Sequence, residues 1–222
     1  MSPTYGSIPV AVQNLFDRPL FTAIGIGIAI GFFPVVCELI VMSSLPGAIS
    51  GWFCLLQMIL FVFSFLFALL GLVPALTLML FRGTRRTVGL VWIACVISLL
   101  FSLPGISLSH FVRLNGFKQM AERTKPLIAA IKRFEAERKA PPAELEDLVP
   151  KYIPQIPSTG IGAYPEFRYE RLMDEPDSWE LRVDCGLGVL NWDEFFYRPS
   201  EKYGERPGGW VEPVGVWAYF HE

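Results

Sequence analysis

The side chains that could carry out chemistry are few and are scattered along the chain. Asp193 and Glu194, which follow Trp192, come closest to the carboxylate pair of a glycoside hydrolase. The two acids are adjacent, however, and neighbouring residues of a strand point to opposite faces of a sheet. The pair is therefore poorly placed for shared chemistry. A hydrolase that uses these acids is our third hypothesis, behind two non-enzymatic ones.

The histidines and cysteines form no recognisable catalytic or metal-binding pattern. His110 and His221 lie at opposite ends of the polar second half of the chain, and their spacing does not support a nucleophile–histidine pair. Of the four cysteines only Cys185 lies in that half, and no CxxC or Cys/His pair has the spacing of metal ligands. We expect no metal, no cofactor and no disulfide within the polar half.

Aromatic residues are concentrated towards the C-terminus. Ten of them fall within 42 residues: Trp179, Trp192, Phe195, Phe196, Tyr197, Tyr203, Trp210, Trp217, Tyr219 and Phe220. Aromatic side chains on loops beside acids can bind a sugar or a peptide. Trp179 and Trp217 lie in alternating strand patterns and are expected in the core. Trp192, Tyr203 and Trp210 lie in or beside polar, glycine-rich loops and are the candidate contacts for a ligand or partner.

The elements that must position these residues begin in a very apolar first half. Its three long apolar runs cover 20–42, 52–81 and 88–108, and Glu38 is the only charged residue in them. Roughly 20 apolar residues span a bilayer as a helix. The sequence therefore predicts a membrane protein with an N-terminal tail over 1–19, three transmembrane helices within 20–108 and a domain outside the bilayer over 109–222.

Charge predicts the orientation of these spans. Cytoplasmic loops collect Lys and Arg. The 82–87 loop carries three arginines, whereas the 43–51 loop carries no charged residue. We therefore predict a cytoplasmic N-terminus and an external C-terminal domain, which in a bacterium means the inner membrane and the periplasm.

The polar half has a basic start and an acidic remainder. Residues 113–139 carry eight basic groups against three acids, whereas 140–222 carry seven against sixteen. An acidic domain repels phosphates, so we exclude nucleic acid as a partner. The lipid bilayer and a membrane or envelope protein are the expected partners.

Two features inside the spans have structural and functional interpretations. Gly27 and Gly31 form a GxxxG pair, which suits close helix packing within the three-helix bundle or, as the alternative, a dimerisation face. Glu38 lies about one turn from the outer end of its span, and no second charged residue within the spans could pair with it. We expect Glu38 to have an interfacial or hydrogen-bonded structural role, and a transporter or channel is disfavoured.

The polar half predicts one helix followed by strands. Apolar residues recur at three- and four-residue steps over 111–138, which indicates an amphipathic helix that Pro126 either kinks or divides. Pro104 and Gly105 should bend the third span, and Gly71 and Pro74 the second. Strand patterns cover 167–172, 179–183, 192–197 and 216–221. The predicted fold class is a membrane protein whose external α+β domain packs a long amphipathic helix on an antiparallel β-meander.

The segment PAELEDLVPKYIPQIPSTG resembles type II secretion major pseudopilins and related type IV pilin-like proteins. The matching positions are Pro142, Leu145, Leu148, Val149, Pro150, Tyr152, Ile153, Ile156 and Pro157, and the resemblance covers about 125–170. It implies a pilin-like fold. The chain has two extra spans and lacks that family's leader and glutamate pattern, so we do not expect processing as a pilin. Asp174, Asp177, Asp184 and Asp193 match no calcium motif and are expected to be solvated turn residues.

Two hypotheses follow for the function. In the first, a non-enzymatic integral membrane protein displays a pilin-like domain outside the cytoplasmic membrane for protein interaction, in the envelope or in secretion. In the alternative, the protein is an envelope sensor or binder whose aromatic loops hold a glycan, a peptide or a small ligand.

Overall fold

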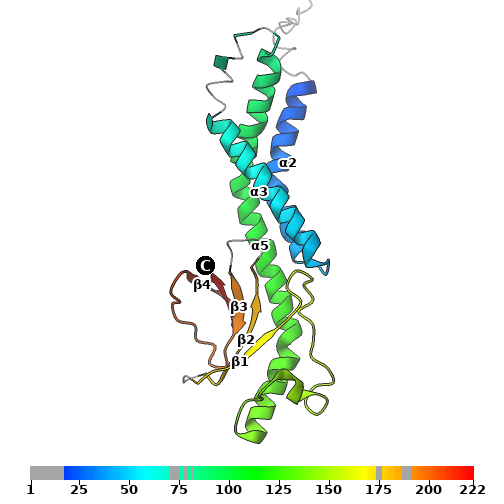
Figure 1. Cartoon of the computed structure of the whole chain (residues 1–222), viewed down its shortest axis with the longest axis vertical. Helices are drawn as coiled ribbons and strands as arrows, with labels where there is room; N and C mark the ends of the chain where they lie inside the picture. The colour runs from blue at the N-terminus through cyan, green and yellow to red at the C-terminus, as the bar shows by residue number, and fades with distance from the viewer. Residues whose placement is uncertain (1–17, 71–75, 78–79, 82, 174–176, 187–191) are drawn as a thin grey trace, which may run out of the picture. The chain divides into compact units, whose positions relative to one another are not determined.

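The structure is a computed structural model that describes residues 18–70, 76–77, 80–81, 83–173, 177–186 and 192–222. The three apolar helices that the sequence predicted are confirmed. They are α2 (Arg18–Val41), α3 (Gly47–Leu70) and α5 (Arg85–Arg138), and each is long and apolar enough to cross a membrane (Figure 1). The predicted kink at Gly71 and Pro74, the tail before Arg18 and the loop residue Arg82 lie outside the described residues.

The helix α5 excludes one of the two alternatives that the sequence left open at Pro126. It is a single helix of 54 residues, so the third span and the amphipathic segment are continuous and Pro126 does not start a second helix. A proline in a helix costs about 3 kcal/mol because it removes one hydrogen bond. Leu127 and Ile131 are fully buried directly after Pro126, and this tertiary packing outweighs the local cost.

The chain divides into two compact units. We call the first the helix unit; it contains the chain up to Val36 and the segment Leu56–Leu108. The second, here called the head unit, contains Cys37–Leu55 and Ser109–Glu222. The head unit is thus larger than the predicted domain over 109–222, because it includes the connection between α2 and α3 with the helix ends that flank it.

Within the helix unit, α2 and α5 approach closely at glycines. A Cβ atom added to Gly27 would lie 2.6 Å from the Ala94 carbonyl oxygen, and one added to Gly31 would lie 2.6 Å from Cβ of Phe101. Gly105 on α5 in turn lies against the Gly31 backbone. These positions leave no room for a side chain, so the GxxxG pair of α2 serves a contact inside the chain.

The head unit contains a five-stranded antiparallel sheet with the order β1-β2-β3-β5-β4. The strands are β1 (Arg168–Arg171), β2 (Trp179–Asp184), β3 (Glu194–Tyr197), β4 (Trp210–Val214) and β5 (Trp217–His221). The four predicted strands pair antiparallel in sequence order, as expected for the meander, and the unpredicted β4 adds an edge strand beside β5. Pro213 lies in β4 and lacks a backbone N–H, which suits an edge strand. A proline also argues against a strand in the sequence, so β4 was not predicted.

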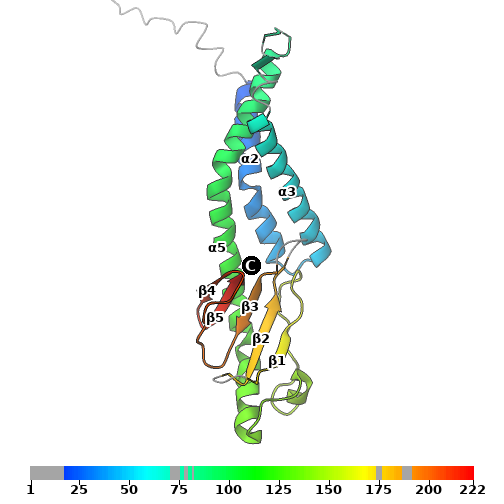
Figure 2. The same ribbon diagram turned by 60° about the vertical axis from the view of Figure 1, so that its left-hand side comes forward.

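The apolar stripe of α5 and the sheet form one core in the head unit, with the strands lying beside the C-terminal part of α5 (Figure 2). The Phe117 ring stacks on Phe195 with centroids 4.5 Å apart. Trp179 and Trp217 are buried, as predicted. Phe134, by contrast, is only partly buried and packs on Tyr152, so this end of the stripe is covered by the segment after the helix.

Candidate functional site

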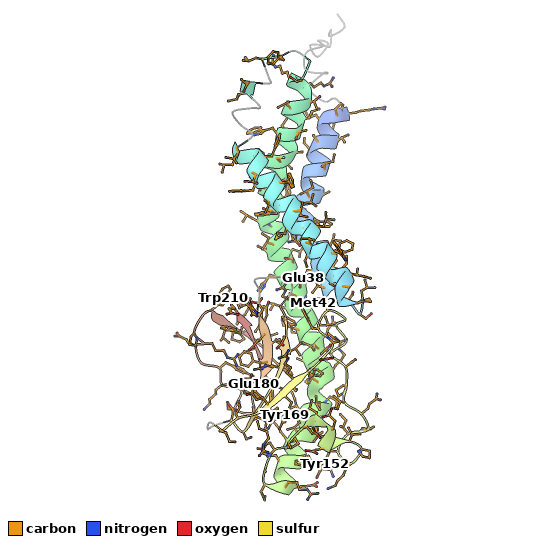
Figure 3. The ribbon with its side chains drawn as sticks, viewed as in Figure 1. Glu38, Met42, Tyr152, Tyr169, Glu180 and Trp210 are labelled. Atoms are coloured by element: carbon orange, nitrogen blue, oxygen red, sulfur yellow. The ribbon has the colours of Figure 1, made fainter. Side chains whose placement is uncertain are left out.

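A buried ion pair joins the end of α2 to α5 within the head unit. Arg113 donates from Nε to Oε1 of Glu38 and from Nη2 to Oε2, both at 2.8 Å. Only 8% of the Glu38 side chain is exposed. Glu38 is labelled in Figure 3. Two parallel charge-assisted hydrogen bonds of this kind fix the orientation of both side chains. Glu38 therefore has the hydrogen-bonded role that we expected, but it has a charged partner that we did not predict.

The same arginine also reaches the C-terminal strand. Its Nη1 donates to the Tyr219 hydroxyl at 2.8 Å and lies 3.7 Å from Oδ2 of Asp193. The Tyr219 hydroxyl donates to the Asp193 carboxylate, and the backbone N–H of Glu222 donates to Oδ1 of Asp193 at 3.1 Å. Burial, together with the bond to Asp193, raises the pKa of Tyr219 far above its ordinary value. The phenol therefore stays protonated and acts as a donor.

This cluster of Glu38, Arg113, Asp193 and Tyr219 has a structural consequence. One guanidinium serves two carboxylates that are almost fully buried. Asp193 is therefore not the solvated turn residue that the sequence predicted. Removing one member of a buried pair costs ~3–5 kcal/mol because the other charge is left without compensation. The cluster therefore couples the end of α2, the helix α5 and the last strand to one another.

Backbone contacts place the α2–α3 connection in the same unit. The Gly162 N–H donates to the Ser43 carbonyl at 2.9 Å, and a Cβ atom at Gly162 would collide with the Leu45 carbonyl. Met42 lies against Gly116 of α5 (Figure 3), where an added Cβ would lie 3.2 Å from Cβ of Met42. The connection is therefore packed on both α5 and the loop before β1.

The two histidines converge on one carboxylate. Nε2 of His110 lies 3.2 Å from Oε1 of Glu212, and Nε2 of His221 lies 3.0 Å from Oε2. Burial raises the pKa of Glu212, but the interactions with His221 and His110 together outweigh it, so this pKa falls below its ordinary value. Among the described residues no three His, Cys, Asp or Glu side chains are arranged to hold a metal ion.

The adjacent acids are separated, and the thiol of Cys185 is unreactive. Asp193 faces Tyr219, whereas Glu194 accepts a bond from Arg206 at 2.8 Å, so the two adjacent acids point to different partners, as the strand geometry predicted. Burial raises the pKa of the Cys185 thiol far above its ordinary value, which keeps it protonated and a poor nucleophile.

The predicted contact residues fall into two groups. Trp210 and Tyr203 line one cavity of about 580 Å³ between the 201–209 loop and β4. Tyr203 is partly buried and donates from its hydroxyl to the Val216 carbonyl at 2.5 Å. Trp192 is 62% exposed and is not part of the lining of that cavity. The structure therefore brings two of the three aromatic candidates together.

Arg113 is the residue that sequence reasoning missed. Its signal was present, because Glu38 precedes the end of the first span by about one turn and Arg113 follows the end of the third by about one turn. Both ends were predicted on the same side of the membrane. A lone acid and a lone cation at matched depths are candidates for a pair.

Comparison with known proteins adds no further guide to function. No protein-family model, curated protein or solved structure matches this chain.

Proposed function

We propose that this chain is a non-enzymatic integral membrane protein that displays the head unit outside the cytoplasmic membrane for interaction with a membrane or envelope protein. The observation that carries the proposal is the buried Glu38–Arg113 pair, with the Ser43–Gly162 backbone bond beside it. These contacts make the short connection between two apolar helices part of the head. A connection with this role has to lie on the same side of the membrane as the head.

The charge distribution supports the orientation. The 43–51 loop carries no charged residue, and three arginines lie in the 82–87 loop. Under the positive-inside rule the second loop is cytoplasmic and the first is external. Because the first loop packs in the head unit, the head is also external, which in a bacterium is the periplasmic side of the inner membrane.

A pilin-like fold for the head is part of the proposal. Leu145, Leu148 and Ile153, which contributed to the resemblance, are buried in the core that α5 and the sheet share. Leu145 and Leu148 belong to the short 3₁₀ helix η2 (Leu145–Leu148) that follows α5. Buried apolar residues at this spacing are what a pilin-like head would need for its packing.

Two experiments test display and interaction separately. A reporter that is active only in the periplasm, fused after Glu222, should be active, and a cytoplasmic reporter at the same position should be silent. The opposite pattern would reject external display. A photo-crosslinking amino acid placed at Met173, which is 97% exposed, should then capture a discrete membrane or envelope protein. The absence of any discrete product from Met173 and from Trp192 would reject the role in interaction.

The cavity beside Trp210 supports a second candidate function, the binding of a ligand by the head. Its volume of about 580 Å³ lies within the range of ~300–1,000 Å³ that is usual for ligand sites. Trp210 and Tyr203 supply aromatic surface there. An envelope sensor or binder would use this cavity for a glycan, a peptide or a small ligand.

A further inference from the structure

The cavity beside Trp210 holds an aromatic ring that is exposed but fixed in place. Trp210 is 62% exposed, and its ring stacks on His221 with centroids 4.4 Å apart and an angle of 8° between the planes. His221 is itself held by Glu212 at 3.0 Å. A ring that is already ordered loses little conformational entropy when a ligand covers it. The face of the indole that His221 does not cover is therefore ordered and accessible to a ligand.

Arg206 is the one cation among the described residues of the lining, and its charge is already neutralised. Arg206 donates to Glu194 and to Glu180, both at 2.8 Å. Its guanidinium also lies 3.7 Å above the centre of the Phe196 ring. These contacts hold Arg206 on the sheet and use its charge inside the head unit. An anionic ligand would have to compete with two carboxylates for it.

The other charged groups of the cavity are acids. Glu201 and Glu205 both line it and both are exposed. The chain from residue 140 onward has sixteen acids against seven basic groups, so the surrounding potential has the same sign. An exposed indole next to carboxylates suits a cation, which gains cation–π attraction from the ring and a charge-assisted hydrogen bond from the acid.

We propose that this cavity binds a lysine or arginine side chain from an extended segment of a partner protein. The inference rests on the proposed role of the head in protein interaction and names the chemistry of the partner. Recognition is by side chain rather than by an added strand, because Pro213 removes a backbone donor from the edge strand β4. Glu201 and Glu205 would hold the cationic group, and Trp210 would lie against it.

The test uses the full-length protein in lipid nanodiscs and two fluorescently labelled peptides. One contains Arg and Lys separated by Gly and Pro, and the other has Gln in place of each basic residue. We expect saturable binding of the basic peptide that weakens as salt is raised, because exposed ion pairs are screened. No binding, or equal binding of the Gln peptide, would overturn the proposal. The proposal would also be overturned if the protein does not bind the basic peptide but binds a neutral chito-oligosaccharide, and if Trp210→Ala abolishes that binding.

A matched pair of variants locates the site. Trp192 and Trp210 are both 62% exposed, but only Trp210 lines the cavity. Trp210→Ala should weaken peptide binding by roughly 3- to 30-fold, the range of a cation–π contact, and Trp192→Ala should leave it unchanged. Glu205→Gln, an exposed loop change that tests the charge without disturbing β4, should weaken binding and reduce its salt dependence. Equal effects of the two Trp variants, or no effect of Glu205→Gln, would overturn the site.

The outcome is distinguishable from failure of the proposed function. If Met173 or Trp192 crosslinks to a partner while Trp210→Ala leaves that product intact, the head interacts but the cavity is not the contact. If the reporter after Glu222 is cytoplasmic, external display itself is wrong.

Discussion

Arg113 and Glu38 are 75 residues apart in the chain and form a two-point ion pair, with both hydrogen bonds at 2.8 Å. The third guanidinium nitrogen of Arg113 donates to Tyr219. One side chain of α5 therefore contacts both the end of the first apolar helix and the last strand of the sheet.

The first prediction concerns the free energy of this pair. Arg113→Gln should destabilise the head unit by ~3–5 kcal/mol, because it leaves the buried carboxylates of Glu38 and Asp193 without their cation. Glu38→Gln should cost less, because Arg113 keeps Asp193 as a partner. The double variant should cost clearly less than the sum of the two, since it leaves no uncompensated member of the pair. Thermal unfolding in detergent, followed by the fluorescence of the buried Trp179 and Trp217, measures these costs.

The control for that cycle is Lys125→Gln, which removes an exposed ion pair with Glu122. Exposed pairs contribute at most about 1 kcal/mol, so this variant should unfold close to the wild type. Additive effects of Glu38→Gln and Arg113→Gln would show that the two side chains are not coupled.

The second prediction compares two phenylalanines of the α5 stripe. Phe117 is fully buried between Phe195 and Tyr219, so Phe117→Ala should cost ~3–5 kcal/mol and lower the melting temperature of the head by more than about 10 °C. Phe134 is only partly buried against Tyr152, and Phe134→Ala should cost less than half as much. If Phe134→Ala were the more destabilising change, the core would be centred near Phe134 and not near Phe117, which would contradict this prediction.

The third prediction is a pH dependence that comes from Glu212. The pKa of this carboxyl in the folded state lies below its ordinary value of 4.5, so its charged form stabilises the fold. That contribution is present above pH 4.5 and is lost as the pH falls through the lower folded value. Glu212→Gln should therefore be less stable than the wild type at pH 6, and the difference should shrink below pH 4.5. A difference that grew on acidification would contradict this assignment.

Much of the fold could be read from local pattern. The three apolar runs, the amphipathic stripe and the strand at 179–184 each follow from a periodicity that the chain itself displays. The edge strand β4 could not be read in this way, because Pro213 and the neighbouring Gly215 look like loop residues. Its place in the sheet is decided by pairing with β5.

The site was less accessible because its contacts are distant in sequence. Glu38 was recognised as unusual, but its partner Arg113 is 75 residues away in the chain and lies outside the apolar runs in which a partner was sought. The convergence of His110 and His221 on Glu212 likewise requires the sheet order, which places the end of β5 beside β4. Residue type indicated which groups were candidates, and only topology showed which of them meet.

A disulfide between Met42→Cys and Gly116→Cys tests most directly whether the α2–α3 connection packs on α5 outside the cytoplasm. A Cβ atom at Gly116 would lie 3.2 Å from Cβ of Met42, a few tenths of an ångström short of the ~3.5–4.5 Å usual in disulfides. The bond should form in living bacteria without added oxidant, because the periplasm is oxidising and the cytoplasm is not. Each single variant, which keeps the four native cysteines, should form none.

The readout is a gel-mobility shift that a reductant reverses. We expect this shift in the double variant taken directly from cells, because the α2–α3 connection should lie against α5 on the external side of the membrane. If the two thiols stay reduced in cells but form the disulfide with a mild oxidant after purification, the external location is contradicted. Thiols that never close would contradict the packing of the connection in the head unit.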